Sequence, residues 1–318
     1  MAGYKAGPVF AAKAGVSAGL LAWLLRDMDW GRMAAGIRAF DLRWLAPVLL
    51  ANALFILLRT WRFAVILRDN PGFALPFPTL LRYYLVSCFF SLLVPGGLAG
   101  DWARIAQVNR HGRSLGFSVQ SVLLERYLGL LALLALSDLL LLLPGSPVDL
   151  PPRGRLALLA ALALGSLPPV LALLRAYRAL PLPAAWKENL DRLSPATFAA
   201  AGILSLALQA AALLVYWTLA SALGLSIAPA VLAPMMLAGS LATLLPISLQ
   251  GLGITQAVFV HGLAAHGIAP EAALVYSLSV FALDLATGLV GGTLFVTGRR
   301  DEASWRGART KSPRTQTG

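Results

Sequence analysis

The sequence predicts an all-α polytopic membrane protein with about six full spans and two re-entrant helical hairpins. Of its 318 residues, 58% are hydrophobic and only 13% are charged, whereas charged residues make up about 25–35% of the surface of a soluble domain. Apolar windows of about twenty residues recur along the chain, and each is long enough to cross roughly 30 Å of hydrocarbon. Two further apolar stretches are interrupted by proline and glycine, and these are the predicted hairpins.

Six apolar windows are long and uninterrupted enough for a full crossing. They lie near residues 8–26, 44–66, 117–143, 155–175, 196–222 and 271–297. Lys13 lies inside the first window, and the following RDMDWG sequence offers no small-residue cleavage site. We therefore expect an uncleaved first span rather than a signal peptide.

The second broken stretch, residues 231–262, is predicted to enter and leave the membrane by one face. The loops at 223–230 and 263–270 hold no Lys or Arg, whereas residues 299–314 carry six basic side chains. Positive charge favours the cytoplasmic side, so the C-terminus is expected inside and both uncharged loops outside. The intervening stretch is then a hairpin, and residues 299–318 form a basic, disordered cytoplasmic tail.

The first broken stretch, residues 80–103, is compatible with either a hairpin or a full span. Charge counting gives about the same bias for both. Internal symmetry favours the hairpin, because a span, a broken stretch and a span at residues 44–143 recur in the same order at residues 196–297, with Pro95 matching Pro246. The two halves then enter the membrane from opposite faces, which is the inverted repeat common among transporters.

The sequence LLVPGGLAGDWARIAQVNR, at residues 92–110, is expected to line a cavity. Non-helical backbone at membrane depth is tolerated only where protein or trapped water satisfies its polar groups. A helix that restarts near Asp101 aims free N–H groups at the break, which favours an anion such as phosphate. Asp101 either caps this helix or contributes to the site, and Arg104 either meets a lipid headgroup or pairs with Asp101.

Two further motifs place charge inside apolar helices. Arg59 and Arg62 in LLRTWRF either extend to the cytoplasmic interface or face the cavity. Glu125 and Arg126 in VLLERYLGLL lie deeper, where a charge costs about 2.5–3.5 kcal/mol and needs a partner or a wet cavity. We expect Glu125 to pair with Arg59 or Arg62.

Other polar residues carry weaker functional signals. Asp284 is a second-tier site candidate beside Gly288 and Gly292, whose spacing suits close helix packing. Cys88, the single cysteine, is expected to be an inert packed thiol. The three histidines lack ligand spacing, so neither a metal nor a cofactor is expected.

The motifs VPGGLAGDWAR, RTWRF, ERYLGLL and LPISLQGLGITQ resemble, in this order, those of the transmembrane domain of lysylphosphatidylglycerol synthetases, also called the flippase-like domain. The resemblance covers about residues 10–297. It implies a flippase-like domain at residues 1–298 that moves a lipid between leaflets, without the soluble aminoacyl-transferase domain of some members. Gln250 stands where a glycine is usual, and Gln256 replaces the glutamate that usually closes the last motif.

The motifs and the resemblance together define the predicted site. The expected headgroup-binding residues are Arg59, Arg62, Gly96, Gly97, Gly100, Asp101, Arg104, Glu125, Arg126, Ser248, Gly251, Gly253 and Gln256, with helix breaks at Pro95 and Pro246. The leading hypothesis is a translocator of an anionic phospholipid or glycolipid in the cell membrane. A membrane-embedded enzyme that modifies lipid headgroups and a non-catalytic scaffold subunit are the alternatives. No catalytic constellation is identified. The expected partners are membrane lipids and further copies of the chain, and no nucleic acid.

Overall fold

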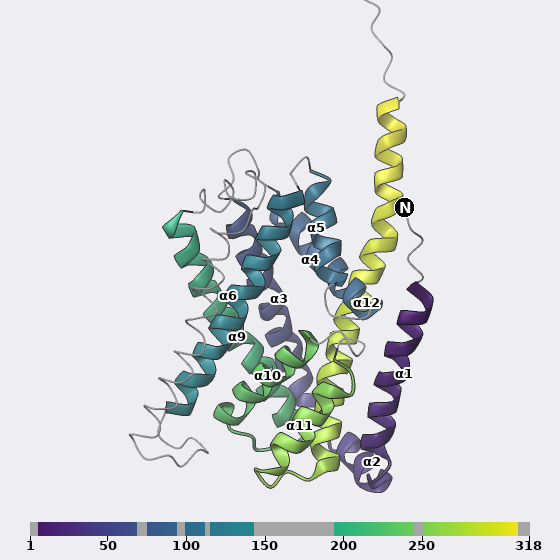
Figure 1. The fold of residues 1–318 in the computed structure, drawn as a ribbon, viewed down its shortest axis with the longest axis vertical. Helices are drawn as coiled ribbons and strands as arrows, with labels where there is room; N and C mark the ends of the chain where they lie inside the picture. The colour runs from purple at the N-terminus through teal and green to yellow at the C-terminus, as the bar shows by residue number, and fades with distance from the viewer. Residues whose placement is uncertain are drawn as a thin grey trace, which may run out of the picture.

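The described part of the chain is built from helices alone. The computed structural model describes residues 6–68, 75–93, 99–111, 115–142, 194–244 and 251–310, and no strand occurs in these ranges. The elements are α1 (Ala6–Leu25), α2 (Trp30–Arg38), the 3-10 helix η1 (Leu42–Trp44), α3 (Leu45–Arg68), α4 (Phe77–Leu93), α5 (Ala99–Asn109), α6 (Leu115–Leu142), α9 (Pro195–Ala222), α10 (Pro229–Leu244), α11 (Ile254–Ala264) and α12 (Pro270–Thr310) (Figure 1).

Four of these helical segments are long and apolar enough to cross a membrane. They are Leu42–Arg68, Leu115–Leu141, Pro195–Ala222 and Pro270–Gly298, each 27 to 29 residues long. They coincide with four of the six predicted spans. The predicted span at 8–26 corresponds to α1, and the one at 155–175 lies outside the described residues. The chain is a multi-pass membrane protein.

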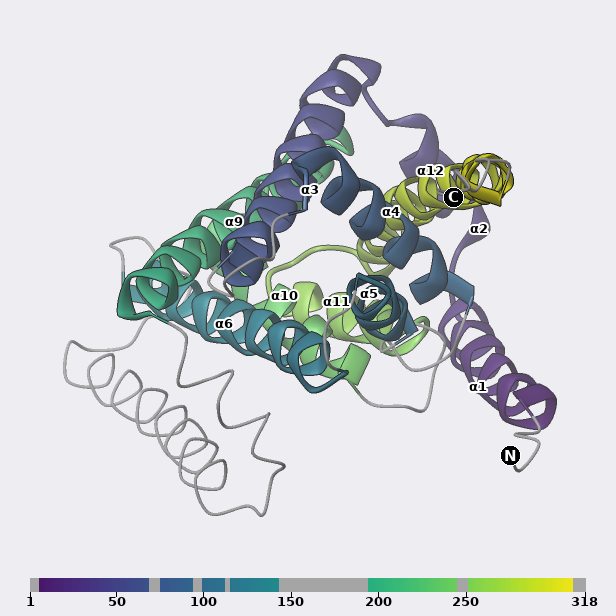
Figure 2. The same ribbon diagram turned by 90° about the horizontal axis from the view of Figure 1, so that it is seen from above.

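The remaining apolar helices form two pairs of short helices. Helices α4 and α5 lie in the upper half of Figure 1, whereas α10 and α11 lie in the lower half. Seen from above, both pairs lie between α12 on one side and α3, α6 and α9 on the other (Figure 2). With 17, 11, 16 and 11 residues, each helix is shorter than the roughly 20 residues that a full crossing requires.

The long helices α3 and α9 pack antiparallel to each other. Arg62 of α3 donates a hydrogen bond to Ser205 of α9, and at the other end the Asp41 N–H, just before η1, bonds to the Ala222 carbonyl at 2.8 Å. Around the second half of α9, apolar side chains of α10, α11 and α12 form the largest buried cluster. This packing fixes the walls between which the polar residues lie.

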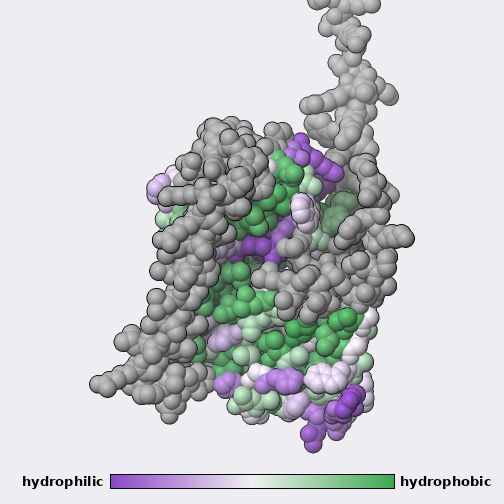
Figure 3. All heavy atoms as spheres, viewed as in Figure 1, coloured by the Kyte–Doolittle hydropathy of each residue, from purple (hydrophilic) through white to green (hydrophobic). Residues whose placement is uncertain are grey.

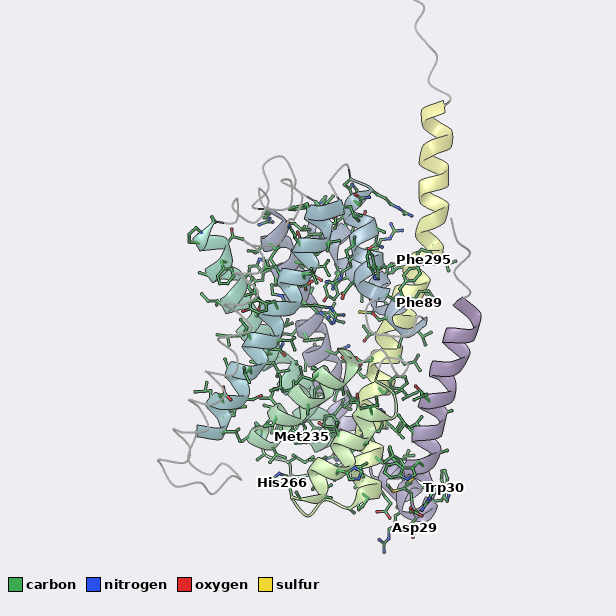
Figure 4. The ribbon with its side chains drawn as sticks, in the orientation of Figure 1. Asp29, Trp30, Phe89, Met235, His266 and Phe295 are labelled. Atoms are coloured by element: carbon green, nitrogen blue, oxygen red, sulfur yellow. The ribbon has the colours of Figure 1, made fainter. Side chains whose placement is uncertain are left out.

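A glycine face of α12 allows α4 to approach closely. A Cβ atom on Gly291 would overlap the Leu85 carbonyl, and one on Gly292 would lie 2.8 Å from the Phe89 ring. The Phe89 ring lies beside Phe295 of α12, with centroids 6.4 Å apart (Figure 4). The expected close packing at Gly288 and Gly292 is thus confirmed, and it includes Gly291.

The first described helix lies at the edge of the helix assembly, and the last one extends beyond its predicted span. Helix α1 stands at the periphery in both ribbon views (Figures 1 and 2) and contacts α11. Asp29, labelled with Trp30 in Figure 4, caps α2 by accepting from Gly31 N at 2.7 Å. Helix α12 continues to Thr310, into the segment 299–318 that the sequence predicts to be disordered. Residues 299–306 contain no proline or glycine to end the helix.

We predict that Gly291→Ala destabilises the protein, because the added methyl group forces α4 and α12 apart, whereas Gly202→Ala does not. Nothing lies within 4 Å of a Cβ atom on Gly202, so this control gains helix propensity, up to about 1 kcal/mol. Overpacking at Gly291 costs about 1–3 kcal/mol. Equilibrium unfolding in mixed micelles measures both changes, and equal stability of the two variants would contradict this packing.

Candidate functional site

Residues from both halves of the chain line a polar cavity of about 380 Å³. Its lining includes nine of the predicted site residues: Arg59, Arg62, Gly100, Asp101, Arg104, Glu125, Arg126, Gly251 and Gln256. Figure 3 shows hydrophilic surface at mid-height on this face of the molecule, between hydrophobic surface above and below. The helix ends and charged motifs that are dispersed in the sequence therefore meet at one place.

Glu125 lies at the centre of the polar lining and is almost fully buried, with 1% of its surface exposed. Its Oε1 accepts a hydrogen bond from Arg62 Nη2 at 2.9 Å, which confirms the predicted pairing for Arg62 rather than Arg59. The second Arg62 nitrogen, Nη1, donates to Ser205 Oγ at 3.0 Å. The arginine is buried too, so it does not extend to the interface.

The pairing continues from Glu125 through α5. Arg104 donates to Glu125 Oε2 and to Asp101 Oδ1, the latter at 2.5 Å. Asp101 Oδ2 accepts from Arg126 Nε. The arrangement Arg62–Glu125–Arg104–Asp101–Arg126, called here the arginine–carboxylate network, joins α3, α5 and α6. Its three guanidinium groups and two carboxylates leave one net positive charge.

Burial explains why these charges are interleaved. Removing a charge from water costs several kcal/mol, and the cost is offset only where opposite charges and hydrogen bonds replace the lost hydration. Arg62 and Arg104 are each only 3% exposed. The network thus holds together helices that a purely apolar contact would leave free to slide.

Arg59 lies beside the arginine–carboxylate network but differs from its members. Its guanidinium carbon lies 4.7 Å from the centroid of the Tyr84 ring and 5.6 Å from that of Phe55. Arg104 contacts the Tyr84 ring at the same distance. Within the described ranges, no carboxylate lies within ion-pair distance of Arg59, so aromatic faces hold this cation in the cavity wall.

Two glycines of the charged motifs make room for this geometry. A Cβ atom on Gly100 would collide with Ser91 Oγ and lie 2.5 Å from the Ser87 carbonyl oxygen, so the glycine lets α5 cross close to α4. One on Gly129 would lie 3.2 Å from Arg62 Nη1. The glycines of GDWAR and ERYLGLL thus serve the placement of Arg104 and Arg62.

In the second half, Gln256 organises the start of α11. Its side-chain Oε1 accepts a hydrogen bond from the Gly253 N–H at 2.6 Å, and the residue is 2% exposed. Gly251 and Gly253 have φ values of 78° and 91°, which favour glycine. A glutamine and a glutamate can both accept this bond, so the replacement of the usual glutamate preserves the helix cap.

Some predicted residues do not join the cavity or cannot be placed. Gly253 packs against Leu20 and Ser17 of α1 instead of lining the cavity. Six residues of the broken motifs lie outside the described residues: Pro95, Gly96, Gly97, Pro246, Ser248 and Gln250. Their expected roles stay predictions.

The structure adds residues that sequence reasoning missed. Tyr84, Ser205 and Gln209 line the cavity or contact its arginines. Gln209 Nε2 donates to the Gly129 carbonyl at 2.8 Å. A polar side chain inside an apolar span is the signal that would have indicated the last two. Among the residues that the structure describes, no three His, Cys, Asp or Glu side chains gather as a metal site requires.

We predict that Glu125→Gln destabilises the protein by about 3 kcal/mol, because it leaves two buried guanidinium groups without a full counter-charge. The control is Asp27→Asn, since Asp27 pairs with Arg26 at 3.1 Å with both side chains exposed and such a pair contributes at most about 1 kcal/mol. Equilibrium unfolding in mixed micelles compares them. A Glu125→Gln variant as stable as the control would show that the network carries no such energy.

The family model of the lysylphosphatidylglycerol synthase TM region matches residues 10–292, a range that contains every motif of the site. None of the curated proteins compared matches the chain. The expected resemblance is confirmed, and the chain belongs to the family of the lysylphosphatidylglycerol synthase transmembrane region.

Proposed function

We propose that this protein moves an anionic phospholipid or glycolipid between the two leaflets of the cell membrane. Its family indicates a membrane function concerned with lipids, and we propose that this function is transport between leaflets. The headgroup enters the polar cavity while the acyl chains stay in the surrounding lipid. Such a path spares the headgroup from crossing bare hydrocarbon, where a charge is costly.

The two pairs of short helices support a path from both faces. At 1.5 Å per residue, the 17 residues of α4 and the 16 of α10 reach about 25 Å, less than the roughly 30 Å of hydrocarbon. Helices α4 and α5 occupy the opposite half of the assembly from α10 and α11 (Figure 1). We interpret both pairs as re-entrant hairpins of an inverted repeat at residues 44–143 and 196–297, as in many transporters.

The observation that carries the proposal is the spare charge of Arg59. The guanidinium groups of Arg62 and Arg104 are committed to carboxylates, and Arg126 is paired with Asp101. Arg59 lines the same cavity without a carboxylate partner among the described residues. A phosphate bound there gains a charge-assisted hydrogen bond without breaking an existing ion pair.

The arginine–carboxylate network then acts as a fixed positive wall. Its net charge attracts an anionic headgroup, and Glu125 and Asp101 hold the three arginines in place. Gly100 and Gly251 bring backbone close to the cavity. These residues orient the headgroup, and Arg59 binds its phosphate.

The geometry gives little support to a headgroup-modifying enzyme that uses Glu125 or Asp101 as its general base. A general base must reach a substrate proton, yet both oxygens of Glu125 accept hydrogen bonds from arginines, and so do both oxygens of Asp101. Neither carboxylate is available for that role in this arrangement.

The orientation of the chain, with its basic C-terminal segment in the cytoplasm, follows from the charge bias alone.

We predict that Arg59→Gln lowers the transfer of labelled phosphatidylglycerol between leaflets of reconstituted vesicles at least about tenfold. Losing one hydrogen bond to a charged group costs about 1.5–3 kcal/mol, and 1.4 kcal/mol corresponds to a factor of ten. The matched control is Arg32→Gln, because Arg32 lies on α2 with 71% of its side chain exposed and outside the cavity.

Two outcomes would contradict the proposal. Transfer at the rate of protein-free vesicles, for anionic phospholipids and glycolipids alike, would exclude translocation. A mass change of the lipid after incubation with candidate donors would instead identify an enzyme. If Arg59→Gln and Arg32→Gln transfer lipid equally well, translocation would stand but Arg59 would not bind the headgroup.

A further inference from the structure

We infer that Asp284 is a proton-binding site that couples the movement of an anionic headgroup to the movement of a proton; this inference rests on the proposed function. Asp284 and Arg59 line the same cavity. Within the described ranges, neither side chain forms an ion pair or a hydrogen bond. One acidic and one basic side chain, neither of them in an ion pair, thus line the same cavity.

Asp284 lies at the centre of its membrane-spanning segment. Fourteen residues separate it from either end of the segment Pro270–Gly298, which places it about 21 Å along the helix from each end. An ionisable residue at this depth is costly and marks an ion or proton pathway by default. Its exposed surface is explained by the cavity that it lines.

Helix α12 contacts α4 on one side of Asp284 along its length and α11 on the other. One turn further along, Gly288 contacts Leu92 at the end of α4. Two turns back, the Tyr276 ring packs against Phe259 of α11, with centroids 5.7 Å apart. Asp284 therefore lies between the part of α12 that packs against α4 and the part that packs against α11.

Three titratable groups interact electrostatically with Asp284 across this space. They are Arg59 of α3, Cys88 of α4 and Tyr216 of α9. Only Arg59 is a cation. The guanidinium of Arg59 is thus the charge that stabilises an ionised Asp284.

The other helices that pack against α12 bring no further charge to this level. Arg32 of α2 pairs with Glu271 in the first turn of α12. His261 of α11 stacks on Trp23 of α1, with centroids 6.3 Å apart. Among the described residues, Arg59 is therefore the cation without a carboxylate partner that faces Asp284, and the arginine–carboxylate network adds one net positive charge to the same cavity.

Headgroup binding and proton uptake favour each other for this reason. A phosphate that binds Arg59 neutralises the charge that stabilises the Asp284 carboxylate and adds a like charge to the same cavity. The carboxylate then takes up a proton from the aqueous phase, forming an O–H bond. When the headgroup leaves, that bond breaks and the proton returns to water. By linkage the effect is reciprocal, so a protonated Asp284 binds the anion more tightly.

The test measures transfer of labelled phosphatidylglycerol in phosphatidylcholine vesicles over a range of pH. Wild-type transfer is expected to fall as the pH rises, by up to about tenfold per pH unit for a single linked proton. Asp284→Asn, which imitates the protonated acid, is expected to remove this dependence. The matched control is Asp138→Asn, because Asp138 also lies in a membrane-spanning helix but does not line the cavity; it is expected to keep the wild-type profile.

A second measurement reads the proton without transport. Infrared difference spectra on adding phosphatidylglycerol are expected to show a new protonated carboxyl band in the wild type and none in Asp284→Asn. The inference is overturned if this band is absent from the wild type, or if the wild type and Asp284→Asn have the same pH profile of transfer. Transfer that follows a sodium gradient at fixed pH would overturn it as well. A wild type that moves no lipid while the band forms would overturn translocation instead.

Discussion

The need to balance buried charge in a hydrocarbon environment governs this structure. Glu125 is almost fully buried in the middle of α6, and it is tolerated because Arg62 and Arg104 approach it from two other helices. The same contacts fix how α3, α5 and α6 lie relative to one another. An apolar interface in a bilayer gains little from excluding lipid. The ionic contacts therefore fix the relative positions of these helices, which apolar packing alone would define less well.

The short helices depend on this arrangement. Helix α5 is only 11 residues long, too short to be stable by itself, yet it carries Asp101 and Arg104. Gly100 brings it against α4, and the glycine face of α12 brings α4 into the assembly. Small residues therefore set the distances, and the charged residues are placed by backbones that could not otherwise come so close.

Hydropathy alone predicts the long helices, because each must present about twenty apolar residues to lipid. It also indicates which charges need partners, as for Glu125. It does not decide between Arg59 and Arg62, since residues three apart differ by about 60° around a helix and only the packing against α9 orients them. The role of Tyr84 depends on residues distant in sequence, so no local pattern reveals it. The cap made by Gln256 is a local motif, and the pattern of the capping box could have predicted it.

The distribution of spare charge distinguishes a site from a structural core. If the polar residues served packing alone, the protein would be more stable with every buried charge paired or replaced by an apolar side chain. Five of the charges that line the cavity are paired, and two, on Arg59 and Asp284, are not paired with any described residue. Both unpaired groups face the polar space rather than the apolar cluster beside α9. Two unpaired charges that face one cavity, where an external ligand has room to enter, are best explained by ligands that complete the pairing, an anion at Arg59 and a proton at Asp284.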